Sequence, residues 1–551
     1  MSTDGFPNVW EVDEKSYGAW MAKAEPELVK TLAPCEEVCF SVVMPTFNTP
    51  LEFLREAIES VISQTHANWQ LCIANDASTD PAVWAELERY GEADRRVRLV
   101  NLHENVGIAS ASNHALKLAT GDYIVLMDHD DVIPSHALQT VANILRDDPG
   151  IKFLYSDSDH LDESGRRCKP FFKPDWDYIR LLGQNYLNHL TVIQHSLLKK
   201  VGGWRQGYEG SQDYDLFLRL QEHTERQEIK HIPHILYHWR MVPDSVSRSS
   251  LGRSVKAARQ AINDHLARIG LAANVRPAGK AVIYNWIEWS PPRTTKSVLL
   301  LVYGEYVSEI VKLIAEADPG KCIFDVQVTV FDQTGSRAQV DVILNQVLHE
   351  ERHDLVGFYD SSLVPENNGW LQSMASMAST GRFGVVGAKC ISHDGILCGG
   401  PVFSDSLSSL SSARAGMVAS PQATEDSRGY IASLLLDQTV TRLSQGFMIF
   451  RRELIEGYKR ESDKAADMES VIDGLCDHAT DRGLGNAWSP KIVFRKRSVG
   501  PVKEVGNAVG TAVGTAVIGS GFTDTNAPPP FLYPNPNFKS IDWRIRWSKN
   551  E

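Results

Sequence analysis

Short apolar runs alternate with helix-like segments from Cys39 onward, and this alternation constrains the fold more than any other feature. The runs FSVVMPT, LCIAND, VRLVN and YIVLM are short and rich in β-branched or aliphatic residues, which is typical of strands. The segments between them carry apolar residues at helical spacing, for example at Leu51, Leu54 and Ile58. Strands that alternate with helices predict an α/β domain with a largely parallel sheet.

Polar residues follow three of these predicted strands. They are Thr46-Phe47-Asn48, Asn75-Asp76 and Asp128-His129-Asp130-Asp131. The run before the last group is wholly apolar, so we expect that strand to be central and buried on both faces. Because ligands of open α/β sheets bind beyond the carboxyl ends of the strands, the three groups are expected to converge there.

The run from Asp128 to Asp131 places like charges side by side at the end of a buried strand. Such carboxylates repel one another and lose hydration, so they need a partner. A divalent cation is one solution, since hard oxygen ligands suit Mg²⁺ or Mn²⁺, and such an ion would bridge a diphosphate. The other interpretation is a helix cap, with Asp130 or Asp131 at the start of the helix near Pro134. The pattern alone does not separate the two. Asp157-Ser158-Asp159 has similar spacing after a shorter apolar run and is interpreted as structural.

Composition excludes several classes of function. A chain of 551 residues favours two or three domains. The formal net charge of -13 argues against a general binder of nucleic acid. The 8 cysteines form no CxxC pair, so neither a zinc knuckle nor a disulfide framework is expected. A P-loop phosphotransferase and a dehydrogenase are disfavoured, because the sequence has no GxxxxGK[ST] and no GxGxxG after its first strand.

Five ordered motifs carry a family resemblance: SVVMPTFNTP, SVISQTHANWQLCIANDASTD, ENVGIASASNHAL, TGDYIVLMDHDDVIP and GSQDYDLFLRL. In this order they closely resemble the inverting family 2 glycosyltransferases of the GT-A fold. The subgroup that they are most similar to makes bacterial O-antigen and surface polysaccharide. The resemblance covers roughly residues 36–275 and implies an α/β GT-A domain that takes a nucleotide-sugar donor, UDP- or dTDP-linked, with Mn²⁺ or Mg²⁺ as cofactor.

The resemblance also implies roles for individual residues. Nucleotide-sugar binding falls to Thr46, Phe47, Asn48, Asp76, Asp128, Asp130 and Arg240, and metal binding to Asp130, Asp131 and His238. The position matching the family's general base, which takes the proton of the acceptor hydroxyl, is Asp213. The family's usual Glu-Asp pair is Gln212-Asp213 here, which removes an acidic role for the first residue of the pair.

Each of these roles has a structural alternative. Asp213 could cap the helix YDLFLRLQEH, although Asp215 is the better capping or structural acid. His238 could be an ordinary packed residue, and Arg240 could pair with a nearby acid rather than a diphosphate. Trp204 is a candidate platform for the acceptor sugar, since sugars stack on aromatic faces, and is nearly as well interpreted as a core residue. The pattern assigns no role to Lys173, which is expected in a loop over the site.

The second half faintly resembles another GT-A domain but lacks the acids. VGFYDSSLVPENNGWLQSMASMA echoes the strand, acidic turn and helix of the first half, with only Asp360 where the acidic run should be. We therefore expect an N-terminal extension (1–35), a catalytic GT-A domain (36–290), a degenerate, inactive GT-A-like domain (297–500) and a flexible linker with a C-terminal tail (501–551). The alternatives are a second active site in the C-terminal domain, or a non-catalytic carbohydrate-binding scaffold.

The N-terminal segment MSTDGFPNVWEVDEK is acidic and has no apolar core, and the sequence contains no apolar run long enough for a spanning helix. We therefore expect a cytoplasmic enzyme without a nucleic-acid partner. Its acceptor would be a glycan or a lipid-linked glycan, and a lipid-linked acceptor would bring it to the inner face of the cell membrane. The donor sugar, the linkage and the oligomeric state, a homo-oligomer included, stay open.

Overall fold

The structure is a computed structural model that describes residues 9–12, 14–241, 251–294, 296–317, 324–331, 353–399, 401–402, 435–440, 442–443, 446–458, 468–497 and 543–546. The chain forms two compact units, built mainly from Glu11–Trp289 and from Ser290–Leu532. β1 (Val9–Val12) and β23 (Trp543–Arg546) form a separate two-stranded sheet. Apart from β23, the predicted linker and tail over 501–551 lie outside the described residues. Among the helices that the structure describes, none is long and apolar enough to cross a membrane.

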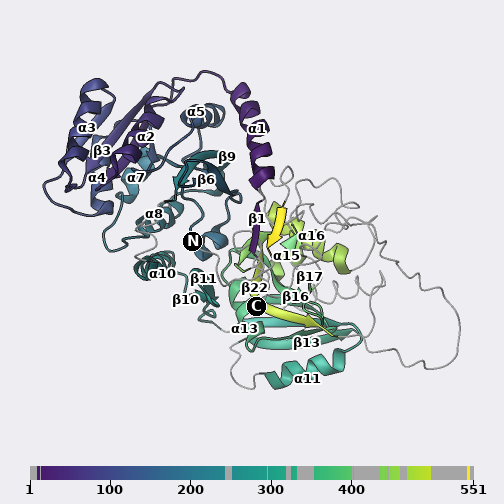
Figure 1. The fold of residues 1–551 in the computed structure, drawn as a ribbon. Coiled ribbons are helices and arrows are strands. Elements are labelled where there is room, and N and C mark those ends of the chain that lie inside the picture. Colours follow the sequence, from purple (N-terminus) through teal and green to yellow (C-terminus); the bar gives the residue numbers. More distant parts are fainter. Residues whose placement is uncertain are drawn as a thin grey trace, which may run out of the picture. The chain divides into compact units, whose positions relative to one another are not determined.

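The first unit is built on a mixed eight-stranded sheet (Figure 1). Its strands are β2 (Phe40–Thr46), β3 (Trp69–Asn75), β4 (Val97–Asn101), β5 (Tyr123–Leu126), β6 (Phe153–Leu161), β7 (Arg167–Phe171), β8 (Thr191–Gln194) and β9 (Ile229–Arg240). Their order is β4-β3-β2-β5-β8-β6-β7, and β9 also pairs with β6. The first four are parallel where they pair, β8 is antiparallel to both of its neighbours, and β9 is parallel to β6. This arrangement confirms the predicted α/β class.

The helices of this unit follow the predicted alternation with the strands. They are α1 (Glu14–Thr31), α2 (Leu51–Ile62), α3 (Pro81–Ala93), α4 (Ile108–Leu118), α5 (Ala137–Asp147), α6 (Tyr178–Gly183), α7 (His195–Val201), α8 (Gln212–Gln221), the 3₁₀ turn η1 (Arg226–Glu228) and α10 (Leu251–Arg268). A hairpin of β10 (Ala273–Ala278) and β11 (Ala281–Trp289) completes the unit. α3 begins where the side chain of Asp80 accepts the amide of Ala82 at 2.9 Å, with Pro81 at the first helical position, as expected for a capped helix.

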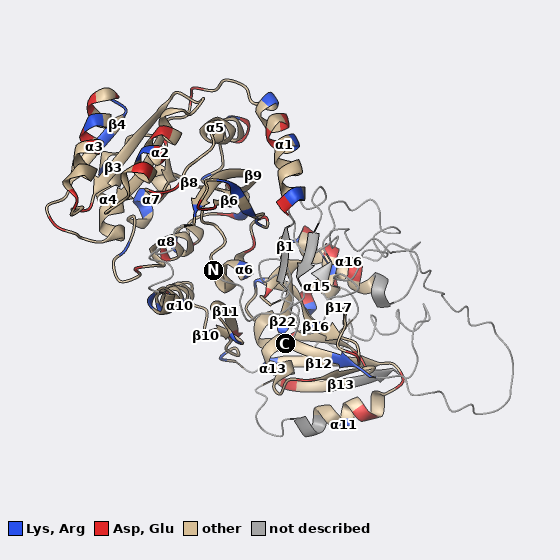
Figure 2. Cartoon of the chain, in the orientation of Figure 1, with Lys and Arg blue, Asp and Glu red and all other residues tan. Residues whose placement is uncertain are grey.

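The hydrophobic core lies between one face of the sheet and α2, α3 and α5. Val42 and Met44 of β2, Leu54 and Ile58 of α2, and Leu138 of α5 belong to it and are fully buried. β5 is buried along its whole length, as its apolar sequence predicts. Acidic and basic residues are intermixed along α1 and α3 rather than gathered into one basic face (Figure 2).

The second unit contains a nine-stranded sheet. Its strands are β12 (Ser297–Tyr303), β13 (Asp325–Phe331), β14 (Leu355–Asp360), β15 (Leu363–Pro365), β16 (Phe383–Ile391), β17 (Leu397–Gly399), β19 (Gln438–Val440), β21 (Met448–Arg451) and β22 (Gly485–Lys496). Its described helices are α11 (Val307–Ala317), α13 (Trp370–Ala378), α15 (Arg452–Gly457) and α16 (Met468–Asp481). A two-stranded sheet joins β18 (Pro401–Val402) to β20 (Arg442–Leu443).

The pairing scheme of the second unit repeats that of the first. β12 is parallel to β13 and β14, as β2 is to β3 and β5. β21 is antiparallel to β14 and β16, as β8 is to β5 and β6. β22 is parallel to β16, as β9 is to β6. The bridge of Val132 to β9 even corresponds to the pairing of β15 with β22. The second GT-A-like domain predicted from the sequence is therefore present.

Candidate active site

The acidic run follows β5, where the buried strand reaches the edge of the sheet. Asp131 is fully buried, and its two carboxylate oxygens accept the hydroxyl of Tyr237 at 2.6 Å and the backbone N–H of Arg240 at 2.8 Å. Burial, with the charges of Asp130 and Asp128, raises the pKa of Asp131 well above its usual range. Asp131 therefore ties the turn to β9. This differs from the metal-ligand role expected for it, because the side chain is fully buried.

Asp128 and Asp130 are the acidic members of the run that meet solvent. Their side chains are 38% and 29% exposed. Burial, together with the charge of Asp130, raises the pKa of Asp128 to about 6, and solvent access to the carboxylate moderates this effect. These two carboxylates are the ones that the fold leaves available to a ligand or cation.

The predicted nucleoside residues lie at the ends of β2 and β3. Asp76 is buried, and its carboxylate accepts the backbone N–H groups of Val106 at 2.8 Å and of Gly107 at 2.9 Å. Gly107 adopts a φ of 83° at the start of α4, a conformation that glycine adopts without strain. Asp76 thus fixes the loop before α4 against the end of β3.

The turn after β2 is fixed in the same way. The side-chain oxygen of Asn48 accepts the backbone N–H of Thr79 at 2.8 Å, which joins the ends of the two strands. Phe47 keeps 41% of its surface exposed. The buried Oγ1 of Thr46 has no hydrogen-bond partner among the described residues. The structure therefore brings Thr46, Phe47, Asn48 and Asp76 to one edge of the sheet, as expected for parallel strands.

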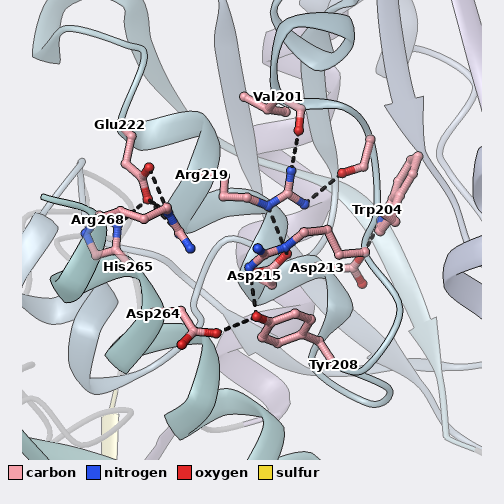
Figure 3. A network of polar contacts seen from close by, with 12 residues as sticks. Val201, Trp204, Tyr208, Asp213, Asp215, Arg219, Glu222, Asp264, His265 and Arg268 are labelled. Carbon is pink, nitrogen blue, oxygen red and sulfur yellow. Dashed lines mark hydrogen bonds and ion pairs between the residues drawn. The ribbon is translucent and has the colours of Figure 1, made fainter.

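Asp213 lies in the first turn of α8, and Trp204 and Asn188 from two separate loops contact its carboxylate. The indole Nε1–H of Trp204 donates to Asp213 Oδ1 at 2.8 Å (Figure 3). Burial and then the charge of Asp128 raise the pKa of Asp213, while His189 and hydrogen bonds from Trp204 and Asn188 oppose that rise. The structure thus places the predicted base within electrostatic reach of the acidic run.

His189 is a member of this site that the sequence did not reveal. Its ring stacks on Tyr237 at a centroid distance of 4.7 Å, and its Nε2 lies 3.5 Å from Asp128 Oδ2. Burial lowers the pKa of His189 to about 4, so the imidazole is neutral at physiological pH. Its buried Nδ1 has no hydrogen-bond partner among the described residues. A single histidine ahead of the apolar strand TVIQ gives no spacing signal, which is why sequence reasoning missed it.

The structure gives protein partners to three predicted ligand residues, which are Trp204, His238 and Arg240. Trp204 is 6% exposed, so its ring is not a surface platform for a sugar. The Nδ1 of His238 lies 2.5 Å from buried Asp159, which also accepts the hydroxyl of Tyr17 and the guanidinium of Arg167. This occupancy of Asp159 agrees with its interpretation as structural. Because the contact uses only Nδ1 of His238, and a carboxylate commonly orients a metal-binding histidine in this way, the metal-ligand role expected for His238 stays a prediction.

Arg240 likewise serves the turn rather than an open ligand site. Its Nε donates to the carbonyl of Asp130 at 2.8 Å, its guanidinium forms an ion pair with Glu56, and it lies 4.4 Å from the ring centroid of Phe53. Arg240 is 8% exposed. These contacts brace the acidic run, and the diphosphate contact expected for Arg240 stays a prediction.

A polar network anchors α8 behind the catalytic candidate (Figure 3). Asp215 is fully buried between the guanidinium groups of Arg205 and Arg219, and Arg219 also donates to the carbonyls of Val201 and Gly203 at 2.7 Å. This is the structural acid that the sequence predicted for Asp215. Through Gly203 and Arg205 the network holds the residues on both sides of Trp204, whose indole donates to Asp213.

The corresponding turn of the second unit has different chemistry. It follows β14, where one oxygen of Asp360 accepts the backbone N–H of Ser362 at 2.8 Å. Ser361 is buried, and its hydroxyl accepts the backbone N–H of Tyr306 at 3.0 Å. At this turn a single acid, which caps its own turn, replaces the three acids of the first unit.

Comparison with known proteins identifies the first unit. Residues 41–202 match the family model described as Glycosyl transferase family 2. A Sinorhizobium fredii protein named "Uncharacterized protein y4gI" is 30% identical over 486 residues, which are 82% of this chain and 52% of that protein. O-antigen biosynthesis protein RfbC of Myxococcus xanthus is 29% identical over 412 residues, 69% of this chain and 32% of RfbC. The chain thus spans about half and about a third of the length of these two curated relatives.

Among solved structures, S. aureus TarS 1–349 in complex with UDP-GlcNAc has 19% sequence identity and a TM-score of 0.36, covering 41% of this chain and 66% of that one. The family model confirms the family that the five motifs predict, and the similarity to RfbC agrees with the predicted surface-polysaccharide subgroup. The first unit therefore contains a glycosyl transferase family 2 domain over residues 41–202, as the five motifs predict.

Proposed function

We propose that this protein is an inverting glycosyltransferase that moves a sugar from a UDP- or dTDP-sugar to a glycan acceptor in the biosynthesis of a bacterial surface polysaccharide. The observation that carries the proposal is the convergence of Asp128, His189 and Asp213 at one site, although they come from three separate segments. The exposed ring of Phe47 and the fixed carboxylate of Asp76 lie at the neighbouring strand ends, where a nucleoside would bind.

Asp213 is the proposed general base. In an inverting transfer the acceptor hydroxyl gives its proton to the base while its oxygen attacks the anomeric carbon of the donor. The bond from that carbon to the diphosphate breaks, and the nucleoside diphosphate leaves with the electron pair. Burial beside Asp128 makes the Asp213 carboxylate a better proton acceptor than an exposed one, since it raises the pKa. Hydrogen bonds from Trp204 and Asn188 favour the ionised form of the carboxylate, and the one from Trp204 also orients it.

The donor set also suits a divalent cation. Within the described residues, no three His, Cys, Asp or Glu side chains are arranged to hold a metal ion. Mg²⁺ sites, however, commonly use one or two carboxylates and take their remaining ligands from substrate phosphates and water. Asp130, with Asp128 beside it, offers such carboxylates. When bound there with the donor, the cation would offset the negative charge of the departing diphosphate.

The second unit is proposed to be a non-catalytic module that serves the first, for example in binding acceptor. The support is the turn after β14, where only Asp360 replaces the acidic run and caps its own turn. Its alternative, a second active site, predicts residual transfer when the first site is disabled. In the full chain, Asp213→Asn should therefore lower transfer by about 10²–10⁴-fold, whereas Asp360→Asn should leave it unchanged.

The test of the function is a donor screen with the full chain. The protein is incubated with Mn²⁺ and a panel of UDP- and dTDP-sugars, and the released UDP and dTDP are measured. We expect release from at least one donor, and faster release when a glycan acceptor is added. A protein that binds these nucleotides without ever releasing them from a sugar would be a binding scaffold instead.

A further inference from the structure

Trp239 is the exposed aromatic side chain on the β9 side of this site. It is 41% exposed, whereas Tyr237, His238 and Arg240 around it on β9 are buried. Its indole therefore keeps surface open to a ligand, while its neighbours on β9 do not.

The indole of Trp239 is held in one orientation by two histidines. Its ring stacks on His160 of β6 at a centroid distance of 5.3 Å and an interplanar angle of 25°. The ring of His189 meets it edge-on at 6.4 Å and 76°. His160 and Trp239 are paired in register across β6 and β9, so the stack is built into the sheet. A ring fixed in this way loses little conformational freedom when a ligand packs on it.

The order of the strands places Trp239 on the acceptor side of the acidic run. β5, which carries the run, has β2 and β3 on one side and β8, β6 and β9 on the other. Phe47 and Asp76, the proposed nucleoside contacts, follow β2 and β3. His189, which touches Trp239, lies 3.5 Å from Asp128, and Asp213 is among its charged neighbours. A ligand resting on Trp239 therefore lies beside the base and on the flank opposite the nucleoside.

We propose that Trp239 is the platform on which a sugar ring of the acceptor stacks, with its hydroxyl directed to Asp213. This inference rests on the proposed function and names its acceptor subsite. The apolar C–H face of a pyranose fits an indole face, while its hydroxyls stay free for polar contacts. Trp204, the platform expected from the sequence, is buried with its N–H on Asp213 and so offers no free face.

The test uses full-length Trp239→Ala and Trp239→Phe proteins, with Trp286→Ala as the matched control. Trp286 is a half-buried tryptophan of β11, a strand that pairs only with β10 among the described strands. Octyl glycosides of glucose, galactose, N-acetylglucosamine and rhamnose serve as acceptor probes, and UDP release gives their KM. UDP binding is measured separately by calorimetry.

We expect Trp239→Ala to raise the glycoside KM about tenfold, because a stacked ring contributes on the order of one tenfold step in affinity. Trp239→Phe should restore most of the lost acceptor affinity. UDP affinity and the Trp286→Ala protein should match the wild type.

Three results would overturn the proposal. The first is an unchanged glycoside KM in Trp239→Ala. The second is a loss of UDP affinity in Trp239→Ala as large as its loss of glycoside affinity, which would make Trp239 a nucleotide contact. The third is a wild-type protein that hydrolyses a donor but responds to none of the glycosides. Failure of the proposed function looks different, because the wild type would then neither bind UDP or dTDP nor hydrolyse any donor.

Discussion

The indole N–H of Trp204 donates a 2.8 Å hydrogen bond to Oδ1 of Asp213. The bond joins the loop after α7 to the first turn of α8, so the residue that the family resemblance marks as the base is held by a side chain nine positions earlier. Gly202 and Gly203, with φ of 80° and 70°, turn the chain so that this contact forms. The orientation of the base is thus a property of the loop as well as of α8.

Trp204→Phe removes this donor and keeps most of the ring. The hydrogen bond favours the ionised carboxylate, so its loss raises the pKa of Asp213 further. A base works only when deprotonated, and its activity is lost as the pH falls through its pKa. We therefore expect the acid limb of the kcat/KM profile to move to higher pH, with UDP affinity unchanged. A higher acceptor KM with an unmoved pH profile would instead return Trp204 to the acceptor-binding role expected from the sequence.

Asp215→Asn should destabilise the first unit. The substitution leaves Arg205 and Arg219 without their shared buried carboxylate, and removing one partner of a buried ion pair costs about 3–5 kcal/mol. Asp264→Asn is the control, because Asp264 is partly exposed and accepts the hydroxyl of Tyr208 at the edge of the network, so its loss should cost about 1 kcal/mol. Urea unfolding measures both. Equal effects would contradict the central position of Asp215 in the network.

Asp130→Asn should raise the Mn²⁺ concentration needed for half-maximal donor turnover about tenfold or more, because it removes a charged oxygen ligand. Asp360→Asn changes the corresponding turn of the second unit and should not alter the metal requirement. A titration of Mn²⁺ against UDP release compares the two proteins. An unchanged requirement in Asp130→Asn would remove this residue from the proposed cation site.

Lys173 should make stability depend on pH in alkaline solution. Its ammonium group is buried against the carbonyls of His189 at 2.7 Å and Leu187 at 3.3 Å, and burial lowers its pKa from 10.5 to about 7. Between these two values the unfolded chain binds the proton more strongly than the folded one does. Lys173 therefore makes stability rise with pH in this window, by at most about 1.4 kcal/mol per pH unit.

Lys173→Met should remove this contribution to the rise of stability with pH. The variant also loses the hydrogen bonds of the lysine, but this cost does not depend on pH. Urea unfolding at several pH values from 7 to 10 should give a less positive slope for the variant than for the wild type. Parallel slopes would show that the lysine stays protonated in the folded protein.

The sequence predicted the framework of the first unit well, because the framework depends on local patterns. The run FSVVMPT is β2 from Phe40 to Thr46, and the wholly apolar run before Asp128 is the buried central strand. Polar residues at the ends of parallel strands meet at one edge by geometry alone, which is why Asn48 and Asp76 could be placed together.

Side-chain partners across the fold could not be predicted in the same way. Lys173 was expected in a loop over the site, yet it is fully buried, and two backbone carbonyls accept hydrogen bonds from its Nζ. His238 points to Asp159, a partner on a strand whose register with β9 has no local signal in the sequence. His189 joins the site only through its packing on Tyr237. Each of these depends on contacts between residues that are distant in the sequence.

The most direct test of the account compares Asp213→Asn with the wild-type chain. Turnover of a UDP- or dTDP-sugar with Mn²⁺ and a glycan acceptor is measured next to nucleotide binding by calorimetry. We predict that Asp213→Asn lowers kcat by about 10²–10⁴-fold, the usual contribution of a general base, and binds the nucleotide as the wild type does. Unchanged turnover in Asp213→Asn would contradict the assignment of the base and, with it, the active site described above.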